Sequence, residues 1–291
     1  MAIGGTRGAV VVTGASSGIG AACALHLDRL GFRVFAGIRK PADAEALRRQ
    51  ASDHLTPLSI DVADGLSVAA AAAAVAERVG AAGLGGLVNN AGIVVAGPLE
   101  LLPIAEVRRQ FEVNVIGQVA ATQAFLPLLR RARGRIVNIG SISGRMATPF
   151  LGPYSASKFA MEALTDALRV EVQPWGIKVA IVEPGAIKTP LWDKSQAAGA
   201  ALLKAAPAEG RDLYARAIEA LQKAATRSEH AAIPADAVAQ AVARALTARR
   251  PKTRYLVGRD ARIQAAIVKL VPDKLRDHLI AKAMRLPADT L

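Results

Sequence analysis

Three residues have the types and the spacing that proton transfer requires: Ser141, Tyr154 and Lys158. Tyr154 and Lys158 are four positions apart in a predicted helix, so their side chains share one face of it. A free tyrosine has a pKa of about 10, and a nearby ammonium group favours the phenolate and lowers that pKa. Tyr154 is therefore a candidate general acid or base. Ser141 follows a predicted strand and is a candidate hydrogen-bond donor to a substrate oxygen.

A glycine-rich segment, residues 13–20, reads TGASSGIG and separates an apolar run from a predicted helix. A helix N-terminus offers free N–H groups and the positive end of the helix dipole, so it binds phosphate well. Glycine lets the backbone turn tightly and approach a ligand closely. The spacing G-x-x-x-G-x-G differs from the more common G-x-G-x-x-G. The segment predicts a pyrophosphate site, with a flexible turn as the alternative.

The second predicted strand ends in two cations, Arg39 and Lys40, where dinucleotide-binding folds place a ribose-binding residue. An acidic residue at this point holds a ribose 2′-hydroxyl, whereas an arginine accommodates a 2′-phosphate. The forked guanidinium group matches phosphate geometry. This favours NADP over NAD, with NAD as the second cofactor choice and a solvated loop charge as the other interpretation.

These motifs belong to an alternation of strands and helices. Apolar runs predict strands at 9–12, 33–36, 58–60, 86–88, 135–139, 178–182 and 254–257. Helical patterns fall at 21–30, 42–50, 67–79, 105–131, 155–172 and 235–246. Near-continuous apolar strands between helices predict an α/β fold, a single doubly wound Rossmann-type parallel sheet with helices on both faces. Because each motif follows a strand, all should meet at the carboxyl edge of the sheet.

Composition excludes several protein classes. Hydrophobic residues make up 52% of the 291 residues and charged residues 21%, which excludes disorder of the whole chain. The single cysteine, Cys23, excludes a disulfide framework and a cysteine-based zinc site, and we expect no metal. No apolar run reaches the roughly 20 residues of a membrane span, and the start lacks a signal-peptide layout. We therefore expect a cytoplasmic protein.

The net charge of +13 is concentrated near the C-terminus, where residues 241–291 hold 12 lysines and arginines against four aspartates. Aromatic residues are only 4%, and no nucleic-acid-binding motif is present, so no nucleic-acid partner is expected. An anionic cofactor, an anionic substrate or an acidic membrane surface would suit such a field. Simple solubility is an equally weighted alternative.

Taken together, these residues resemble the short-chain dehydrogenase/reductase family over roughly residues 8–258. The resemblance implies hydride transfer between a nicotinamide and a carbonyl or alcohol carbon of a small-molecule substrate. It also implies a catalytic tetrad in which Asn114 holds a water of a proton relay and Lys158 binds the nicotinamide ribose. The implied tetrad is Asn114, Ser141, Tyr154 and Lys158. The implied cofactor contacts are Gly14, Ser16, Ser17, Gly18, Ile19, Gly20, Arg39, Asp61, Val62, Asn90, Ala91, Gly92, Tyr154, Lys158, Pro184, Gly185, Ile187 and Thr189.

Within the family, Arg39 is similar to the NADP-preferring pattern, whereas Ser17 stands where some NADP-preferring members carry a base. Residues 1–258 are predicted to form the NAD(P)-binding domain, with a lid at about 190–230. Residues 35–41 and 253–258 resemble the retinol- and hydroxysteroid-dehydrogenase branch, which implies a bulky apolar, retinoid-, steroid- or lipid-like substrate. The apolar lid residues would line the site or simply pack on the sheet. They are Leu191, Trp192, Leu202, Leu203, Leu213 and Tyr214.

Residues 259–291 form a predicted basic, amphipathic, helical extension. Such a helix lies on a membrane surface, covers a partner subunit or covers its own active-site mouth. We favour packing over peripheral membrane contact. The family resemblance implies a homodimer or homotetramer packed through the helices at 105–131 and 155–172.

Two classes of function remain on sequence grounds. One is an active NADP(H)-dependent oxidoreductase, and the other is a non-catalytic protein that senses or binds NADP(H) on the same fold. The intact set of Ser141, Tyr154 and Lys158 favours the enzyme, because a sensor needs only the glycine-rich segment.

Overall fold

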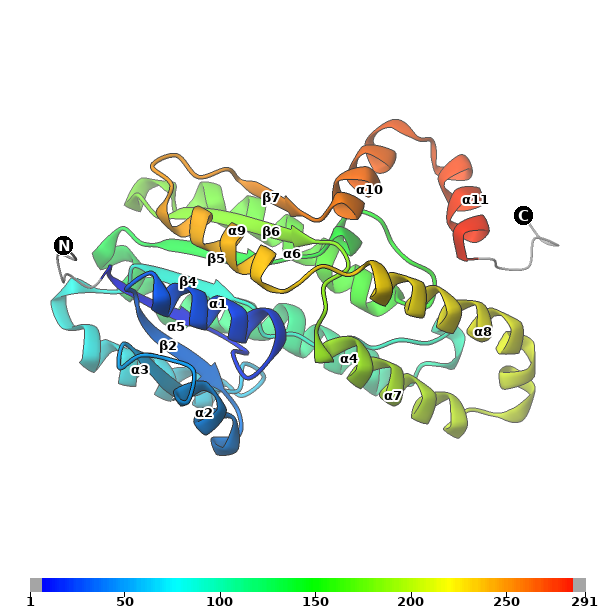
Figure 1. Ribbon diagram of the computed structural model, residues 1–291, viewed down its shortest axis with the longest axis horizontal. Coiled ribbons are helices and arrows are strands. Elements are labelled where there is room, and N and C mark those ends of the chain that lie inside the picture. The colour runs from blue at the N-terminus through cyan, green and yellow to red at the C-terminus, as the bar shows by residue number, and fades with distance from the viewer. Residues whose placement is uncertain (1–6, 285–291) are drawn as a thin grey trace.

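A computed structural model describes residues 7–284 and contains one sheet of seven parallel strands in the order β3-β2-β1-β4-β5-β6-β7 (Figure 1). The strands are β1 (Ala9–Val12), β2 (Arg33–Ile38), β3 (Leu55–Ser59), β4 (Gly86–Asn89), β5 (Arg135–Ile139), β6 (Lys178–Pro184) and β7 (Arg254–Val257). The chain starts at the centre, adds β2 and β3 on one side, and crosses to β4 on the other. This reversal between β1 and β4 is the switch point of a doubly wound sheet, so the predicted fold is confirmed.

Helices cover both faces of the sheet (Figure 1). One layer consists of α1 (Gly18–Arg29), α2 (Pro41–Arg48) and α9 (Asp236–Thr247), and the other of α3 (Gly65–Val79), α5 (Gly117–Ala132) and α6 (Gly152–Glu171). Successive strand side chains point to opposite faces. Val10 and Val12 therefore enter the core under the first layer, whereas Val11 and Phe35 enter the core under the second. Burial on both faces explains the continuous apolar strands.

The segment Gly65–Ala82 is long and apolar enough, by length and composition, to cross a membrane. This differs from the expectation that no such run exists, because alanine raises the mean hydropathy of α3 without making it strongly apolar. In the folded protein α3 lies beside α5, and Val68, Ala71 and Val75 are its buried residues. The segment therefore serves as a helix that covers the sheet.

The predicted long helix at 105–131 is interrupted. It consists of α4 (Ile104–Phe111) and α5, joined by a π-helical turn, η3 (Glu112–Ile116). A π turn contains one extra residue per turn and often occurs at functional sites. Asn114 lies in the middle of this turn and is fully buried.

Four helices project beyond the carboxyl ends of the strands (Figure 1). The predicted lid consists of α7 (Pro190–Ala205) and α8 (Ala208–Ala231), which are separated at Pro207. The predicted extension consists of α10 (Arg259–Leu270), which packs on β7, and α11 (Asp273–Met284), which packs on α8. Its last residues, 285–291, lie outside the described part of the chain. The short 3₁₀ turns are η1 (Gly80–Ala82), η2 (Leu99–Leu101), η4 (Ile142–Gly144) and η5 (Gln173–Trp175).

Candidate active site

All the residues predicted to bind the cofactor line one cleft of about 350 Å³. The cleft lies at the carboxyl ends of the strands, where the switch point places ligands. The four predicted catalytic residues also line it: Asn114, Ser141, Tyr154 and Lys158. The cleft thus brings together segments that follow six different strands.

The glycine-rich loop has a shape that favours glycine at three positions. Gly14 and Gly18 have φ values of +65° and +56°, a region that side chains disfavour. A Cβ at Gly20 would collide with the Gly14 carbonyl oxygen and the Asn90 side chain. Asn90 Nδ2 donates to the carbonyl oxygens of Thr13 and Gly14, at 2.9 and 3.0 Å. The Asn90 amide, predicted to contact the cofactor, therefore also holds the loop in place.

The first turn of α1 fits a pyrophosphate. Its N-cap residue, Ser17, makes no side-chain hydrogen bond to this turn, and no acidic residue lies there. The N–H groups of the turn therefore remain open to a ligand at the positive end of the helix dipole. Thr13 Oγ1 accepts hydrogen bonds from the N–H groups of Asn90 and Ala91, at 3.0 and 3.1 Å, and joins this loop to the segment after β4.

Arg39 lies at the rim of the cleft, directly after β2, and is exposed. Among the described residues, no salt bridge includes it. Its guanidinium group is therefore available to an anion at this position. Lys40 is exposed as well but does not line the cleft.

The proton-transfer group lies near the start of α6. Tyr154 and Lys158 are both buried, with Lys158 Nζ 5.8 Å from the centre of the Tyr154 ring. Lys158 Nζ donates to the carbonyl oxygen of Ile139 at 2.8 Å, and Ser141 Oγ accepts the N–H of Ser143 at 3.1 Å. These contacts hold the Lys158 ammonium and the Ser141 hydroxyl at the end of β5.

Burial dominates the electrostatics of this group. It raises the pKa of Tyr154 above its ordinary value, and a hydrogen bond with Ser141 acts in the opposite direction. The expected lowering of this pKa by Lys158 is therefore wrong for the protein alone, because the ammonium is directed at the Ile139 carbonyl and burial outweighs it. Burial also lowers the pKa of Lys158 from 10.5 to about 8.

An acidic pair lies behind Lys158. Burial, with the neighbouring carboxylate of Glu183, raises the pKa of Glu162 to about 7. Arg145 pairs with Glu183 at 2.6 Å, and Arg254 pairs with Glu162 at 3.1 Å. These pairs link the catalytic helix α6 to β6, β7 and the segment after β5.

A buried polar stripe holds the segment that follows β4. Asn114 Oδ1 accepts the N–H of Ile93 at 2.8 Å, and its Nδ2 donates to the Ile93 carbonyl at 3.0 Å and to Ser157 Oγ at 3.2 Å. Gln118 Nε2 donates to the carbonyl of Ala91 at 2.7 Å, and Gln110 binds the same segment. The sequence interpretation singled out Asn114 alone. The spacing of four from Gln110 to Asn114 to Gln118 is the signal that marks the others.

Asp260 is a second residue that the sequence interpretation missed. Its Oδ2 accepts the N–H of Ala186 at 2.7 Å, and its carboxylate packs against Gly185 and Gly258. The start of the C-terminal extension therefore holds the segment predicted to line the nicotinamide. An aspartate in the first turn of a helix that follows a glycine is its sequence signal.

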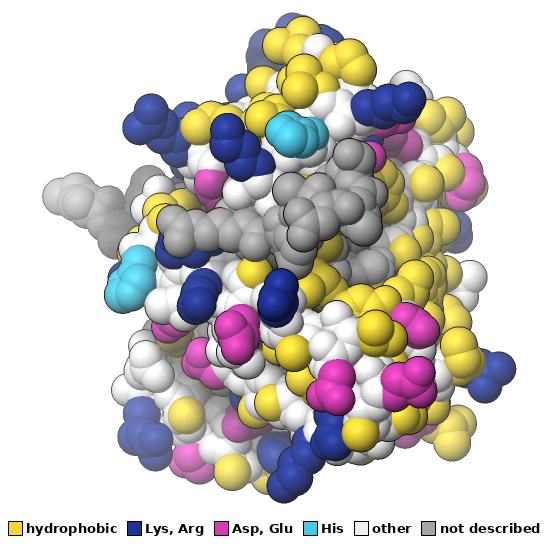
Figure 2. Space-filling model, turned by 90° about the vertical axis from the view of Figure 1, so that its right-hand side faces the viewer, with side chains coloured by type: hydrophobic (Ala, Val, Ile, Leu, Met, Phe, Trp, Pro, Cys, Tyr) yellow, Lys and Arg dark blue, Asp and Glu magenta, His cyan; other side chains and the backbone are white. Residues whose placement is uncertain are grey.

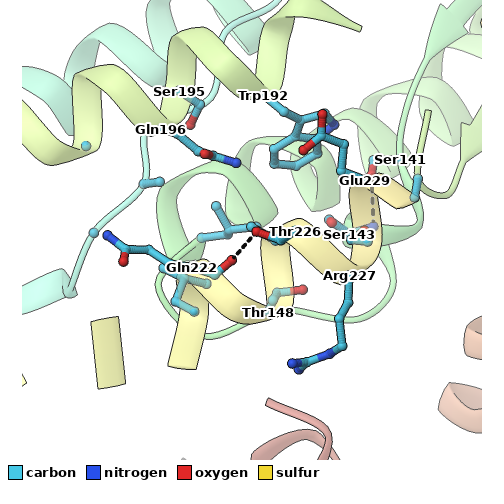
Figure 3. A pocket seen from close by; sticks show the side chains of 18 of the residues that line it. Ser141, Ser143, Thr148, Trp192, Ser195, Gln196, Gln222, Thr226, Arg227 and Glu229 are labelled. Atoms are coloured by element: carbon cyan, nitrogen blue, oxygen red, sulfur yellow. Dashed lines mark hydrogen bonds between the residues drawn. The ribbon is translucent and has the colours of Figure 1, made fainter. Parts of the chain in front are cut away.

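A larger cavity of about 1590 Å³ adjoins the cleft and shares Ser141 and Trp192 with it (Figure 3). The lid helices α7 and α8 and the extension helices α10 and α11 all contribute to its wall. Of the predicted lid residues, Trp192, Leu202 and Leu203 line this cavity and Leu191 lines the cleft. Leu213 and Tyr214 line neither.

Leu213 and Tyr214 lie on the surface of the protein instead. Leu213 is 72% exposed. Tyr214 donates a 2.7 Å hydrogen bond from its hydroxyl to Glu100, because its position on α8 faces the surface beside η2. The extension contributes Ile267, Leu279 and Ile280 to the cavity wall. It therefore packs beside its own site and forms part of the cavity wall.

Comparisons with known proteins agree with this geometry. The family model described as short chain dehydrogenase matches residues 8–200. The chain is 38% identical over 280 residues to the NADPH-dependent 3-dehydrocapnine reductase of Ornithobacterium rhinotracheale, covering 94% of this chain and 96% of that protein. It is 39% identical over 290 residues to the 17-beta-hydroxysteroid dehydrogenase type 6 of Bos taurus, and 37% identical over 293 residues to the retinol dehydrogenase 5 of Mus musculus. Each match covers 97% of this chain and 90% of the relative.

A solved short chain dehydrogenase from Burkholderia cenocepacia, in complex with NADP, superposes with a TM-score of 0.73 at 26% identity, covering 94% of this chain and 98% of that one. The matched residues contain the glycine-rich loop and the buried Ser141, Tyr154 and Lys158. The chain therefore belongs to the short-chain dehydrogenase family, in its retinol- and hydroxysteroid-dehydrogenase-like branch, and is an oxidoreductase that acts on alcohols and carbonyls with NAD(P).

Proposed function

We propose that this enzyme uses NADP(H) to interconvert a bulky apolar carbonyl and its secondary alcohol, of retinoid, steroid or lipid-like character. The observation that carries the proposal is the cavity of about 1590 Å³ beside Ser141. Pockets for small ligands commonly measure about 300–1,000 Å³, so a short-chain alcohol would leave most of this one unfilled. Leucine, isoleucine and tryptophan side chains from the lid and the extension provide apolar contacts for a large hydrocarbon body.

The chain's own residues have distinct roles in this reaction. Tyr154 gives a proton to the carbonyl oxygen in reduction and takes it back in oxidation, and Ser141 donates a hydrogen bond to the same oxygen. Lys158, whose Nζ donates to the Ile139 carbonyl at the end of β5, would bind the cofactor ribose. The Asn114 side chain is engaged with Ile93 and Ser157, and a relay water would bind at this residue. A bound nicotinamide supplies or accepts the hydride.

The choice of NADP rests on Arg39. Its charge lies at the rim of the cleft after β2, where the ribose 2′-group arrives in this fold. The description of one relative as an NADPH-dependent reductase, and of one similar structure as an NADP complex, supports the same choice.

A two-cofactor substrate panel tests the proposal. Initial rates would be measured with NADPH and with NADH on carbonyls of graded size, from butanone to fused-ring and long-chain ketones. We expect NADPH to be preferred, and kcat/KM to rise with the apolar bulk of the ketone. A preference for NADH, or a highest kcat/KM on the smallest ketone, would reject the corresponding half of the proposal.

A further inference from the structure

Trp192 occupies the boundary between the two hollows of the site. It lies near the start of α7 and lines both the cofactor cleft and the large cavity. Its ring packs edge-to-face on Tyr154, with the ring centres 6.1 Å apart and the planes at 71°. Figure 3 shows its side chain directed from α7 into the cavity. No other described aromatic ring makes such a pair with Tyr154.

The position of this ring is fixed by its helix. Thr189, which caps α7, and Pro190, its first residue, lie against Gly18 of the glycine-rich loop. Further along α7, Gly199 packs on the carbonyl oxygen of Ala96 with little space for a side chain. Ser195, one turn after Trp192, is buried. Contacts on both sides of Trp192 therefore hold α7 in place, and the indole ring has a defined position in the wall of the site.

We propose that Trp192 is a specificity-determining residue that orients an apolar substrate body beside the reacting carbon and screens the Tyr154 side from water. The indole offers a broad, rigid, apolar face at low cost in side-chain entropy. A bulky ketone placed between this face and Ser141 presents its carbonyl oxygen toward Tyr154. A short ketone gains little from the same face. This inference rests on the proposed function, since it deepens the account of the same substrate site.

Matched tryptophan substitutions test the assignment. Trp175, the second tryptophan, stacks under Arg130, 4.3 Å from its ring centre, and lines neither hollow. Trp192→Ala and Trp192→Phe would be compared with Trp175→Ala and Trp175→Phe. The probes are a fused-ring ketone and butanone, each with NADPH, and NADPH binding is titrated separately.

We expect Trp192→Ala to reduce the ratio of kcat/KM for the fused-ring ketone over butanone by about tenfold or more, chiefly through KM. Trp192→Phe should retain most of the ratio. The Trp175 variants should retain all of it and should keep the NADPH affinity of the wild type within about twofold. An unchanged ratio in Trp192→Ala, or an equal fall for both ketones with loss of NADPH binding, would overturn the proposal. If the wild-type enzyme prefers butanone, the proposed substrate class fails, but the effect of Trp192 on the ratio is still measured.

A fluorescence readout keeps the test independent of folding in the alanine variant. In Trp175→Phe, Trp192 is the sole tryptophan. Adding the fused-ring ketone together with oxidised NADP forms a complex that cannot turn over, and we expect a change in the emission of Trp192. Trp192→Phe, in which only Trp175 emits, should show none. If the ketone inhibits Trp175→Phe competitively without changing its emission, the proposed contact does not exist.

Discussion

Tyr154 combines two properties that a proton donor requires. Its hydroxyl is hydrogen-bonded to Ser141, and its ring is buried and packs edge-to-face on Trp192, so the group is oriented and protected from water. The raised pKa keeps the phenol protonated in the protein alone. This is the form that gives a proton to a carbonyl oxygen, so the apo electrostatics suit reduction.

Replacing Tyr154 by phenylalanine should abolish turnover while leaving cofactor binding nearly intact. The ring still fills the same space beside Trp192, but the proton donor is gone, and a positioned acid or base contributes about 10²–10⁴-fold to the rate. Steady-state rates and NADPH fluorescence titrations would be measured on both proteins. Activity within tenfold of the wild type would remove Tyr154 from the mechanism.

The buried Lys158 makes stability depend on pH. Burial lowers its pKa from 10.5 to about 8. Below that value the ammonium is charged in both states, so its burial destabilises the folded protein. Between about 8 and 10.5 the folded state loses the proton first, the unfolded state binds more protons, and stability rises with pH.

Lys158→Met should therefore gain stability over the wild type near neutral pH, by up to about 3 kcal/mol, and lose this advantage as the pH approaches 10. Methionine fills the space without a buried charge. Urea unfolding of both proteins without cofactor, at several pH values, gives the difference in the free energy of unfolding. A difference that does not change with pH would show that the Lys158 pKa is ordinary.

Arg39 should set the cofactor preference by itself. A hydrogen bond to a charged group contributes about 1.5–3 kcal/mol, and about 1.4 kcal/mol is tenfold in affinity. Arg39→Ala is expected to raise the KM for NADPH ten- to hundredfold, by these estimates, and to leave that for NADH nearly unchanged. Lys40→Ala, at the adjacent position outside the cleft, is the matched control and should have a smaller effect. A wild-type preference that survives Arg39→Ala would assign the 2′-phosphate contact elsewhere.

At the scale of elements, strands were the most predictable part of the fold. Each predicted strand is present with its boundaries within a few residues, because continuous apolar runs mark strands buried on both faces. The break at Glu112–Ile116 was not visible, because helix continues on both sides of it and the extra residue of a π turn shifts the apolar pattern by only one position. The site residues were predictable where they follow strands. Asp260 and Trp192 were not assigned to the catalytic or cofactor site, because the fold of the lid and extension brings them there.

The glycine-rich loop gives a prediction about a whole element. Gly20→Ala would press a methyl group onto the Gly14 carbonyl and the Asn90 amide. Overpacking of this kind costs about 1–3 kcal/mol, and a displaced loop should also weaken NADPH binding. The control is Gly65→Ala at the start of α3, where a Cβ meets nothing within 4 Å and helix propensity favours alanine by up to about 1 kcal/mol.

Thermal unfolding and NADPH titration of the two glycine variants would test whether the loop lacks space for a side chain at Gly20. Loss of stability and of NADPH affinity should be confined to Gly20→Ala. If Gly20→Ala binds NADPH as tightly as the wild type, the loop accommodates the methyl group despite its contacts with Gly14 and Asn90. The close approach of the loop to the pyrophosphate would then not be needed for binding.

At the scale of the whole molecule, the functional residues are gathered at one edge of the sheet. The edge that carries the carboxyl ends of the strands is enclosed by the lid and by the extension, whose first helix also holds the segment at Gly185 through Asp260. Figure 2 views the molecule from this end, and hydrophobic side chains lie among lysines and arginines where α10 and α11 form the top of the view. Ile263, Leu270 and Leu275 are exposed on these helices. Ile267, Leu279 and Ile280 of the extension line the large cavity together with Arg276, whereas Lys269, Lys274 and Lys282 stay exposed.

The outer side of α6 and the adjoining π turn is the part of the surface that we expect to join two copies of the chain. Ile116, Phe159 and Leu164 are 53%, 44% and 38% exposed there, and η3 packs beside α6. Stable interfaces bury about 800 Å² per partner around an apolar centre. Phe159 is the largest of these side chains, so a charge at its position would have to be buried unpaired in the assembly.

Phe159→Glu should therefore convert the assembled wild type into monomers, with cofactor binding preserved because Phe159 does not line the cleft. Leu66→Glu is the matched control: Leu66 is 83% exposed but lies at the start of α3, away from α6, and its variant should keep the wild-type assembly state. Sedimentation velocity at several protein concentrations measures the assembly state of all three proteins. A wild-type monomer, or a Phe159→Glu protein that assembles like the wild type, would exclude this face as the interface.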